Sequence, residues 1–312
     1  FILIFLFVLI VLSLGIFFIF HKENNNSSNN FFWLSRETSI LINNWFMMYF
    51  LSVVLIGTVY PIFLDVISGE KISVGPPFYQ KLIIPFLIPF LLFMSLGPRL
   101  KWIKSKIENR NSLIITFIIS VMLTFFIIKN LTTDLLFYTV LIFAAFFLFF
   151  TTFKELFIKK FDNISQTVSH FGFSLLILSI LFNSILSSEI ITNIKLGEKY
   201  NYNKGEIFFK KIEERKESNF NSIIAFFEIK DKNGKSIELK PQIRIYNQPE
   251  IITSEADIKT TLLEDKFLVM NLVKGNEYFN IRYQVKPFMV WIWISVLLLS
   301  LGGLMSLFKR KI

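Results

Sequence analysis

Residues 165–187 read SQTVSHFGFSLLILSILFNSILS, and the interpretation of the whole chain starts from this stretch. It is apolar enough and long enough to form a helix that crosses a bilayer. It also carries His170, about one turn from its start. An ionisable side chain inside a membrane helix is energetically costly, so it usually marks a functional site. The stretch therefore predicts a membrane helix with a site near one of its ends.

Four polar residues of this stretch share one face at helical spacing, namely Gln166, Thr167, His170 and Ser174. Farther along the helix the same face becomes aliphatic. An imidazole whose second ring nitrogen is held by amide and hydroxyl neighbours suits an axial haem ligand. The same pattern is found where a histidine only hydrogen-bonds to a neighbouring helix. The residues alone leave both interpretations open.

The composition indicates an integral membrane protein. Of the 312 residues, 53% are hydrophobic and 39 are Phe, more apolar surface than a soluble domain needs. Cys is absent, which excludes thiol chemistry, iron–sulfur clusters and disulfides, and two His without Cys disfavour a zinc site. The first apolar run lacks the basic start and the cleavage site of a signal peptide, and it has no initiator Met. We therefore expect a fragment or a processed chain.

Seven stretches are long and apolar enough to be predicted as membrane helices. They are roughly residues 1–20, 39–60, 82–97, 112–128, 134–153, 166–187 and 288–308. The third is short and contains Pro85 and Pro89, which predicts a kinked or partly re-entrant helix. Residues 59–82 contain two Gly and three Pro, and we expect a shaped loop there.

The basic residues of the membrane portion are distributed unevenly between the two sides. The loops after the first, third and fifth helices, with the C-terminal tail, hold 13 of them: Lys22, Arg36, Arg99, Lys101, Lys104, Lys106, Arg110, Lys154, Lys159, Lys160, Lys309, Arg310 and Lys311. The short loops on the other side hold only Lys71, Lys81 and Lys129. The positive-inside rule then predicts a cytoplasmic C-terminus and a periplasmic N-terminus. The net charge of +10 is explained by topology, without nucleic-acid binding.

Residues 188–286 differ in kind, with 17 basic and 15 acidic residues and no apolar run of membrane length. Segments 223–230 and 235–246 alternate apolar and polar residues around Asn233-Gly234, which predicts a β-hairpin. Segments 267–273 and 278–285 predict two further strands around Lys274-Gly275. The segment contains no His, and the pair Glu213-Glu214 is interpreted as surface charge.

The predicted fold is thus an all-α membrane protein of about seven transmembrane helices with one inserted periplasmic β-rich domain. Its expected units are residues 1–187, with six helices, residues 188–286, the β-rich domain, and residues 287–312, the last helix and a basic cytoplasmic tail.

Several segments together resemble the C-terminal half of the CcmF family, the large membrane subunit of the bacterial cytochrome c haem lyase. They are SRETSILINN (35–44), LIGTVYP (55–61), ISVGPPFYQKLIIPF (72–86), LGPRLKW (96–102), SHFGFSLLILSI (169–180) and the closing stretch from IRYQVKPF to GGLMSLF (281–308). Each motif is modest by itself. Their order and spacing make the resemblance specific, and it covers nearly the whole chain, most weakly in the β-rich segment.

The resemblance implies an inner-membrane protein that receives haem from a periplasmic chaperone. The family helps attach that haem to apocytochrome c, together with thiol-reducing lyase partner subunits. It also implies a haem b held between two membrane histidines and linked to haem reduction. His170 falls at one of these ligand positions, with Gln166, Thr167 and Ser174 around it. The chain would then be part of a holocytochrome c synthase.

The family's Trp-rich haem-binding motif and its second haem ligand belong to an N-terminal half that is absent here. We therefore expect the chain to need that half, either as a lost N-terminus or as a separate subunit. His21 is disfavoured as the second ligand because it lies beside Lys22 at the start of an Asn/Ser-rich linker. A non-catalytic scaffold stays an alternative. A transporter is disfavoured because only the sixth predicted helix carries an ionisable residue near mid-membrane.

Overall fold

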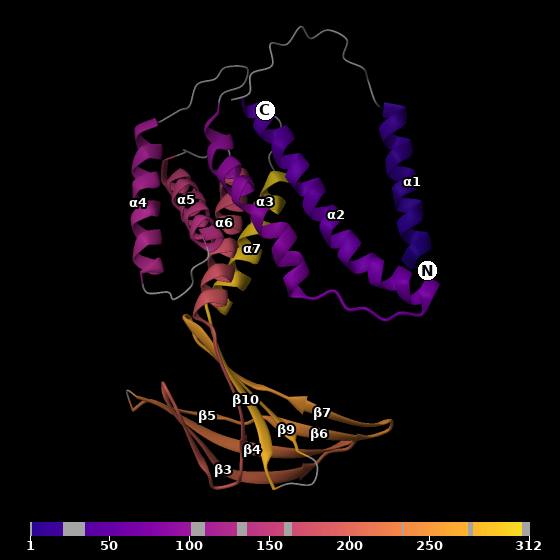
Figure 1. The fold of residues 1–312 in the computed structure, drawn as a ribbon, viewed down its shortest axis with the longest axis vertical. Coiled ribbons are helices and arrows are strands. Elements are labelled where there is room, and N and C mark those ends of the chain that lie inside the picture. The colour runs from indigo at the N-terminus through magenta and orange to yellow at the C-terminus, as the bar shows by residue number, and fades with distance from the viewer. Residues whose placement is uncertain are drawn as a thin grey trace.

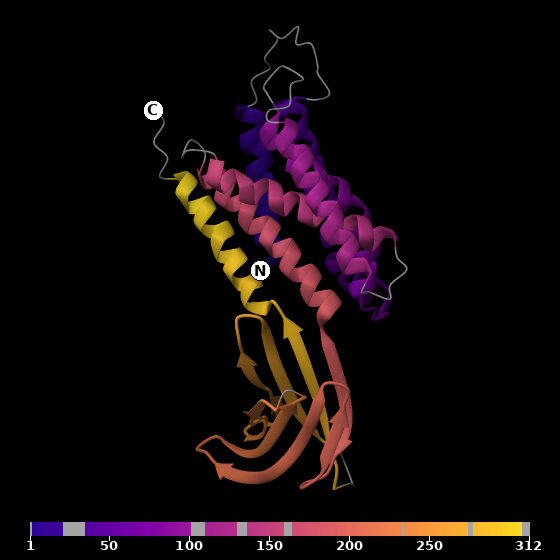
Figure 2. The same cartoon turned by 90° about the vertical axis from the view of Figure 1, so that its left-hand side faces the viewer.

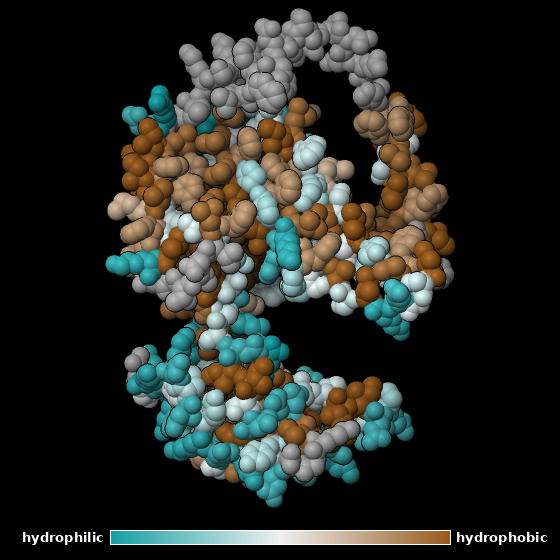
Figure 3. Space-filling view, in the orientation of Figure 1, coloured by the Kyte–Doolittle hydropathy of each residue, from teal (hydrophilic) through white to brown (hydrophobic). Residues whose placement is uncertain are grey.

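The molecule consists of a bundle of helices and a β-sandwich, and the chain passes between them twice (Figures 1 and 2). The computed structural model describes residues 2–20, 35–100, 110–129, 136–158, 164–232, 234–273 and 277–307. The sandwich is inserted between the last two helices, so its chain enters from one and leaves into the other. The surface of the bundle is dominated by hydrophobic residues, whereas the sandwich is largely hydrophilic (Figure 3). The predicted class, membrane helices with one inserted β-rich segment, is confirmed.

The bundle contains helices of membrane length. They are α1 (Ile2–Phe20), α2 (Arg36–Ser68), α3 (Pro76–Leu96), α4 (Arg110–Ile128), α5 (Leu136–Ile158), α6 (Ile164–Leu186) and α7 (Met289–Leu307), and a 3-10 turn η1 (Gly97–Arg99) extends α3. Within the described residues, six of these helices are long and apolar enough to cross a membrane, and α1 contributes a shorter apolar stretch, Ile4–Phe20. The chain is therefore a multi-pass membrane protein.

The predicted loop at 59–82 and the predicted shortness of the third helix are wrong. Most of segment 59–82 is helical, because α2 continues to Ser68 and α3 already begins at Pro76. Pro76 and Pro77 lie in the first helical turn, where a missing backbone N–H costs nothing. With its 21 residues α3 is long and apolar enough to cross a membrane, and Pro85 and Pro89 lie inside it. Membrane helices tolerate such prolines because neighbouring groups satisfy the freed carbonyls.

Helix α5 forms the centre of the bundle, with α3, α4 and α6 packed against it. Its inward residues Leu141, Ile142, Ala144, Ala145 and Leu148 are at most 3% exposed. By contrast, nearly all of the described side chains of α1 are exposed. The apolar surface of α1 is thus left for lipid or for another polypeptide.

Helices α6 and α7 run side by side and approach closely (Figure 2). A Cβ on Gly172 of α6 would lie 2.9 Å from the backbone N of Leu299. A Cβ on Gly302 of α7 would overlap Ser169 Oγ and come within 2.7 Å of Ser169 N. Small residues at both positions let the two backbones meet, as is common between membrane helices.

The β-sandwich consists of two antiparallel sheets. One has the order β1-β10-β9-β8, and the other has the order β2-β3-β4-β6-β7 with β5 also paired to β4. The strands are β1 (Ser188–Ile194), β2 (Lys199–Tyr202), β3 (Gly205–Lys216), β4 (Phe220–Asp231), β5 (Ser236–Leu239), β6 (Gln242–Asn247), β7 (Glu250–Glu255), β8 (Asp257–Thr260), β9 (Glu264–Leu272) and β10 (Phe279–Pro287). The antiparallel pair β4–β5 confirms the predicted hairpin, although segment 235–246 is divided into β5 and β6. The pair β9–β10 confirms the two further predicted strands.

The two sheets share one apolar core, in which Phe209 and Phe227 stack with ring centroids 4.3 Å apart. A charged contact also joins the sheets, because Lys266 of β9 lies 2.8 Å from Asp231 of β4. Burial opposes the positive charge of Lys266. The hydrogen bond to Asp231 and the nearby Glu264 nevertheless raise the pKa of its ammonium group.

The junction between sandwich and bundle is fixed by several contacts. Asn183 Nδ2 on α6 donates a hydrogen bond to Pro287 O at 2.6 Å, where β10 ends. The next residue, Phe288, has φ +60°, a conformation that non-glycine residues rarely adopt. Its ring packs against Phe182 with centroids 5.3 Å apart. The turn into α7 is therefore held by α6 rather than by a free linker.

Candidate functional site

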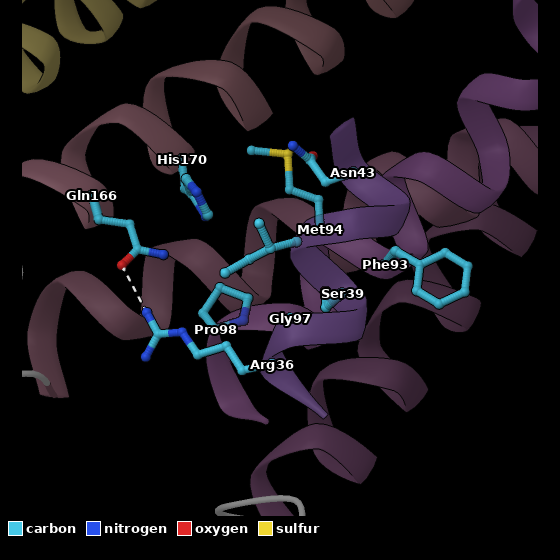
Figure 4. Close-up of a pocket in the computed structure, with 10 residues that line it drawn as sticks. Arg36, Ser39, Asn43, Phe93, Met94, Gly97, Pro98, Gln166 and His170 are labelled. Carbon is cyan, nitrogen blue, oxygen red and sulfur yellow. Dashed lines mark hydrogen bonds between the residues drawn. The ribbon is translucent and has the colours of Figure 1, made fainter. Parts of the chain in front are cut away.

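A small pocket is formed where α2 and α6 begin and α3 ends (Figure 4). This end of the bundle lies opposite the β-sandwich (Figure 1). The volume of the pocket is about 140 Å³. Its walls are Arg36, Ser39, Ile40 and Asn43 from α2, Phe93, Met94, Gly97 and Pro98 from α3 and η1, and Gln166 and His170 from α6. The volume is below the roughly 300–1,000 Å³ of a typical ligand site. The pocket can thus enclose only one edge of a large cofactor.

Helix α6 presents Gln166 and His170 to the pocket because they lie one turn apart on the same face. In Figure 4 both side chains extend from α6 toward α2 and the end of α3. Two lining residues are joined by a hydrogen bond, in which Arg36 Nη2 donates to Gln166 Oε1 at 3.4 Å. This long hydrogen bond joins helices that are 130 positions apart in the sequence.

Local structure at the start of α2 positions Arg36. The preceding residue, Ser35, is the N-cap, and its hydroxyl accepts a hydrogen bond from Thr38 N at 3.2 Å. Such a cap satisfies one of the free donors of the first turn. Gly97 permits the close approach of η1, since a Cβ there would lie 2.5 Å from Ser39 Oγ. The cap and this glycine together bring the walls from α2 and α3 into contact.

A buried ion pair holds η1 from its other side. Arg99 Nε lies 3.3 Å from Glu155 Oε1 on α5, and Arg99 Nη2 donates to Thr151 O at 3.2 Å. Arg99 and Glu155 are each only 8% exposed. From its position in the sequence Arg99 was predicted to lie in a cytoplasmic loop, and its pairing with Glu155 was not predicted. The signal that could have indicated the ion pair is the carboxylate of Glu155, which lies near the end of the apolar helix α5.

The structure separates the four polar residues that the sequence analysis grouped around the predicted ligand position. Gln166 and His170 line the pocket, whereas Thr167 and Ser174 are buried and do not line it. The Ser174 and Thr152 hydroxyl oxygens lie 2.9 Å apart, which links α6 to α5. His21 lies outside the described residues. Arg36, Asn43 and Met94 were not predicted as pocket residues, because they come from other helices.

The chemistry of the pocket combines an imidazole with a guanidinium, amide groups and a thioether on an otherwise apolar wall. An imidazole is a common metal ligand, and a guanidinium is suited to binding carboxylates. Within the described residues no three His, Cys, Asp or Glu side chains are grouped so that they could hold a metal ion. A metal bound at His170 would therefore need further ligands from a cofactor or from another chain.

Fold and pocket define the class, a multi-pass membrane protein with a β-sandwich between its last two helices and one histidine in an interhelical pocket. Residues 185–287 match the family model described as the CcmF C-terminal beta-sandwich. The chain is 27% identical over 292 residues to the cytochrome c-type biogenesis protein CcmF of Pseudomonas fluorescens, covering 89% of this chain and 44% of that protein. The CcmF protein of Escherichia coli K12 is also 27% identical, over 286 residues with the same coverage.

A more distant relative aligns over more of the chain. The cytochrome c-type biogenesis protein NrfE of Haemophilus influenzae is 23% identical, covering 98% of this chain and 49% of that protein. A solved structure of "Cytochrome c Heme Lyase CcmF" superposes with a TM-score of 0.67 at 21% identity, over 88% of this chain and 46% of that one. This likeness shows the fold.

The chain is therefore similar to the C-terminal half of CcmF proteins, as its motifs predicted. It spans less than half the length of these curated relatives.

Proposed function

We propose that the chain is a membrane subunit of a cytochrome c haem lyase. In this role it takes part in haem delivery, in haem b-linked reduction and in the covalent attachment of haem to apocytochrome c. One observation carries the proposal: His170 lines an interhelical pocket in a chain similar to CcmF over 89% of its length. The remaining parts of the lyase, including the surface that binds substrate haem, belong to an N-terminal partner half.

His170 is proposed as one axial ligand of a haem b. The donor set fits this cofactor, since a haem combines a metal, a flat apolar ring and carboxylate groups. Phe93 and Met94 supply apolar wall, and Arg36 supplies a cation for a carboxylate. Once bound, a haem supplies a one-electron iron couple. The chain's own residues hold the ring in place, while Gln166 orients Arg36 and Ser174 fixes α6 against α5.

The proposed location is the bacterial inner membrane, with the sandwich in the periplasm. Arg36, Arg99, Arg110 and Lys154 lie at the bundle end opposite the sandwich (Figure 1). Over the whole sequence 13 basic residues of the membrane portion belong to this side and three, Lys71, Lys81 and Lys129, to the other. The positive-inside rule therefore supports a periplasmic start of α1 and a cytoplasmic end of α7. This orientation presents the sandwich to periplasmic partners, proposed to be a haem chaperone, apocytochrome c and thiol-reducing lyase subunits.

The ligand role is tested with His170→Ala, made in the complex of this chain with its N-terminal half. We expect the b-type absorption spectrum to be lost or greatly weakened and cytochrome c maturation to fall. Insertion should persist, because removing a polar group from a membrane helix makes insertion easier. Added imidazole should restore part of the spectrum by filling the vacated axial position.

The matched control is His21→Ala, which should leave haem content unchanged. An unaltered spectrum in His170→Ala would return this residue to a purely structural role. Equal loss in both variants would place both axial ligands in this chain. A complete complex of both halves without any b-type spectrum would favour the alternative, a non-catalytic scaffold for the assembly.

A further inference from the structure

The turn between β8 and β9 presents two leucines outward at the end of the sandwich nearest the bundle. Leu262 and Leu263 are 69% and 67% exposed. The next residue, Glu264, pairs with Pro287, which lies two residues before α7 begins. In Figure 2 the turn between β8 and β9 rises beside the start of α7. The register therefore holds the two leucines at the level where a membrane-spanning helix starts.

The backbone carbonyls of Leu262, Leu263 and Glu264 in this turn all accept hydrogen bonds. Phe288 N donates to Leu263 O at 2.8 Å, and the indole Nε1 of Trp291 donates to Leu262 O at 2.9 Å. Thr261 closes the turn, because its N and Oγ1 both donate to Glu264 O, at 3.0 and 2.7 Å. In water, carbonyls at the tip of a turn can be left to solvent. At a membrane each unsatisfied carbonyl is costly, so this bonding suits a lipid environment.

The tryptophans at the start of α7 also indicate that the turn between β8 and β9 lies at the membrane surface. Trp291 and Trp293 lie in the first turns of the helix, and Trp293 is 66% exposed. Tryptophan is enriched where membrane helices cross from hydrocarbon into the headgroup region. Since Trp291 binds the turn directly, the leucines lie within the same layer.

We propose that residues 261–263 form a membrane-inserted turn, with Leu262 and Leu263 among the lipid acyl chains beside the start of α7. The sandwich then contacts the bilayer at a third point, in addition to its two connections to α6 and α7. Because a turn bonded to α7 cannot swing away, this contact sets how the sandwich tilts relative to the membrane. The inference depends neither on haem binding nor on which side the sandwich occupies.

The chain has no Cys, so a single introduced thiol reports on one position. Leu262→Cys carries a nitroxide spin label in the full chain, reconstituted into phosphatidylcholine vesicles. Power saturation then measures collisions with oxygen, which concentrates in lipid, and with a water-soluble nickel chelate. The matched control is Leu196→Cys, an equally apolar turn residue that is 54% exposed beyond the far end of β1.

We expect the label at position 262 to collide with oxygen and to lose collisions with the nickel chelate, and the label at 196 to do the reverse. Leu263→Cys repeats the measurement, so that a local disturbance by one label cannot decide the result. Equal nickel accessibility at 262 and 196 would place the turn in water and overturn the proposal. Shielding of 262 from both reagents would show that protein covers it, which would overturn the proposal as well.

Discussion

Arg36 is the residue at the pocket whose charge gives the clearest expected effect. In the complex with the N-terminal half, Arg36→Gln should weaken haem retention, because a propionate would lose its cationic partner. Hydrogen bonds to charged groups contribute about 1.5–3 kcal/mol, so the loss should be roughly ten- to a hundredfold. Transfer of haem to excess apomyoglobin, followed by absorption, measures this effect independently of maturation.

Arg36→Lys should restore part of that retention, since the charge is kept but the planar fork is lost. Arg110→Gln serves as the control, because Arg110 lies at the same end of the bundle without lining the pocket. Retention by Arg36→Gln equal to that of the unmodified chain would exclude a role for Arg36 in binding a carboxylate of the cofactor.

The pair Arg99–Glu155 gives the second prediction for single residues. Removing one partner leaves the other charge buried, so Arg99→Met or Glu155→Met should each destabilise the bundle by about 3–5 kcal/mol. The double variant should recover most of this loss, because two methionines fill the site without charge. Thermal unfolding of the purified chain in detergent measures all three variants. Additive losses in the double variant would show that the two side chains do not act as a pair.

These residues also show how far a sequence can define a site. His170 and Gln166 were predictable, because polar residues stand out in an apolar helix and share a face at helical spacing. Arg36 and Met94 were not, because they join the pocket only through the packing of α2 and α3 on α6. The link between Arg99 and Glu155 was hidden because charges near a helix end look like loop charges.

Among the elements, the strands were easier to predict than the ends of the helices. Alternating residues on either side of Asn233-Gly234 defined the β4–β5 hairpin correctly, because the strand period and the turn residues agree. The glycines and prolines of 59–82 indicated a loop, yet most of that segment extends α2 and α3. Their meaning depends on position, since Pro76 and Pro77 start a helix as readily as they end one.

The contact between α6 and α7 supplies the prediction for elements. Gly302→Ala should destabilise the chain by roughly 1–3 kcal/mol, because the added methyl group would meet the backbone of Ser169. Gly303→Ala should be neutral or slightly stabilising, since no atom lies within 4 Å of its Cβ position. Both variants gain the same helix propensity, so their difference in melting temperature in detergent reports packing alone.

Ser169 directly precedes His170, so the same pair of variants also tests how packing affects the pocket. Gly302→Ala should disturb the position of the imidazole, and Gly303→Ala should not. Equal melting temperatures for the two variants would mean that α6 and α7 do not meet as closely as the structure places them.

At the scale of the whole molecule, the helix bundle separates the pocket at one end from the β-sandwich at the other. Arg36, Arg99, Arg110 and Lys154 lie at the end that holds the pocket, whereas Lys71, Lys81, Lys129 and the sandwich occupy the other end (Figure 1). Because α6 begins at the pocket and ends at the sandwich, the pocket and the sandwich lie at opposite ends of the bundle, whichever side of the membrane holds the sandwich. The proposed haem b and the proposed periplasmic chemistry are therefore separated by the thickness of the bundle.

The last prediction tests this arrangement in intact cells. Ser218→Cys lies on the exposed turn between β3 and β4, and Ser105→Cys lies in the connection between α3 and α4. With no native Cys to compete, a membrane-impermeant thiol reagent added outside should label position 218 and leave 105 unmodified. Lysing the cells should make 105 reactive, which shows that its thiol is available. Labelling of 105 but not 218 in intact cells would reverse the orientation, and with it the assignment of the sandwich to the periplasm.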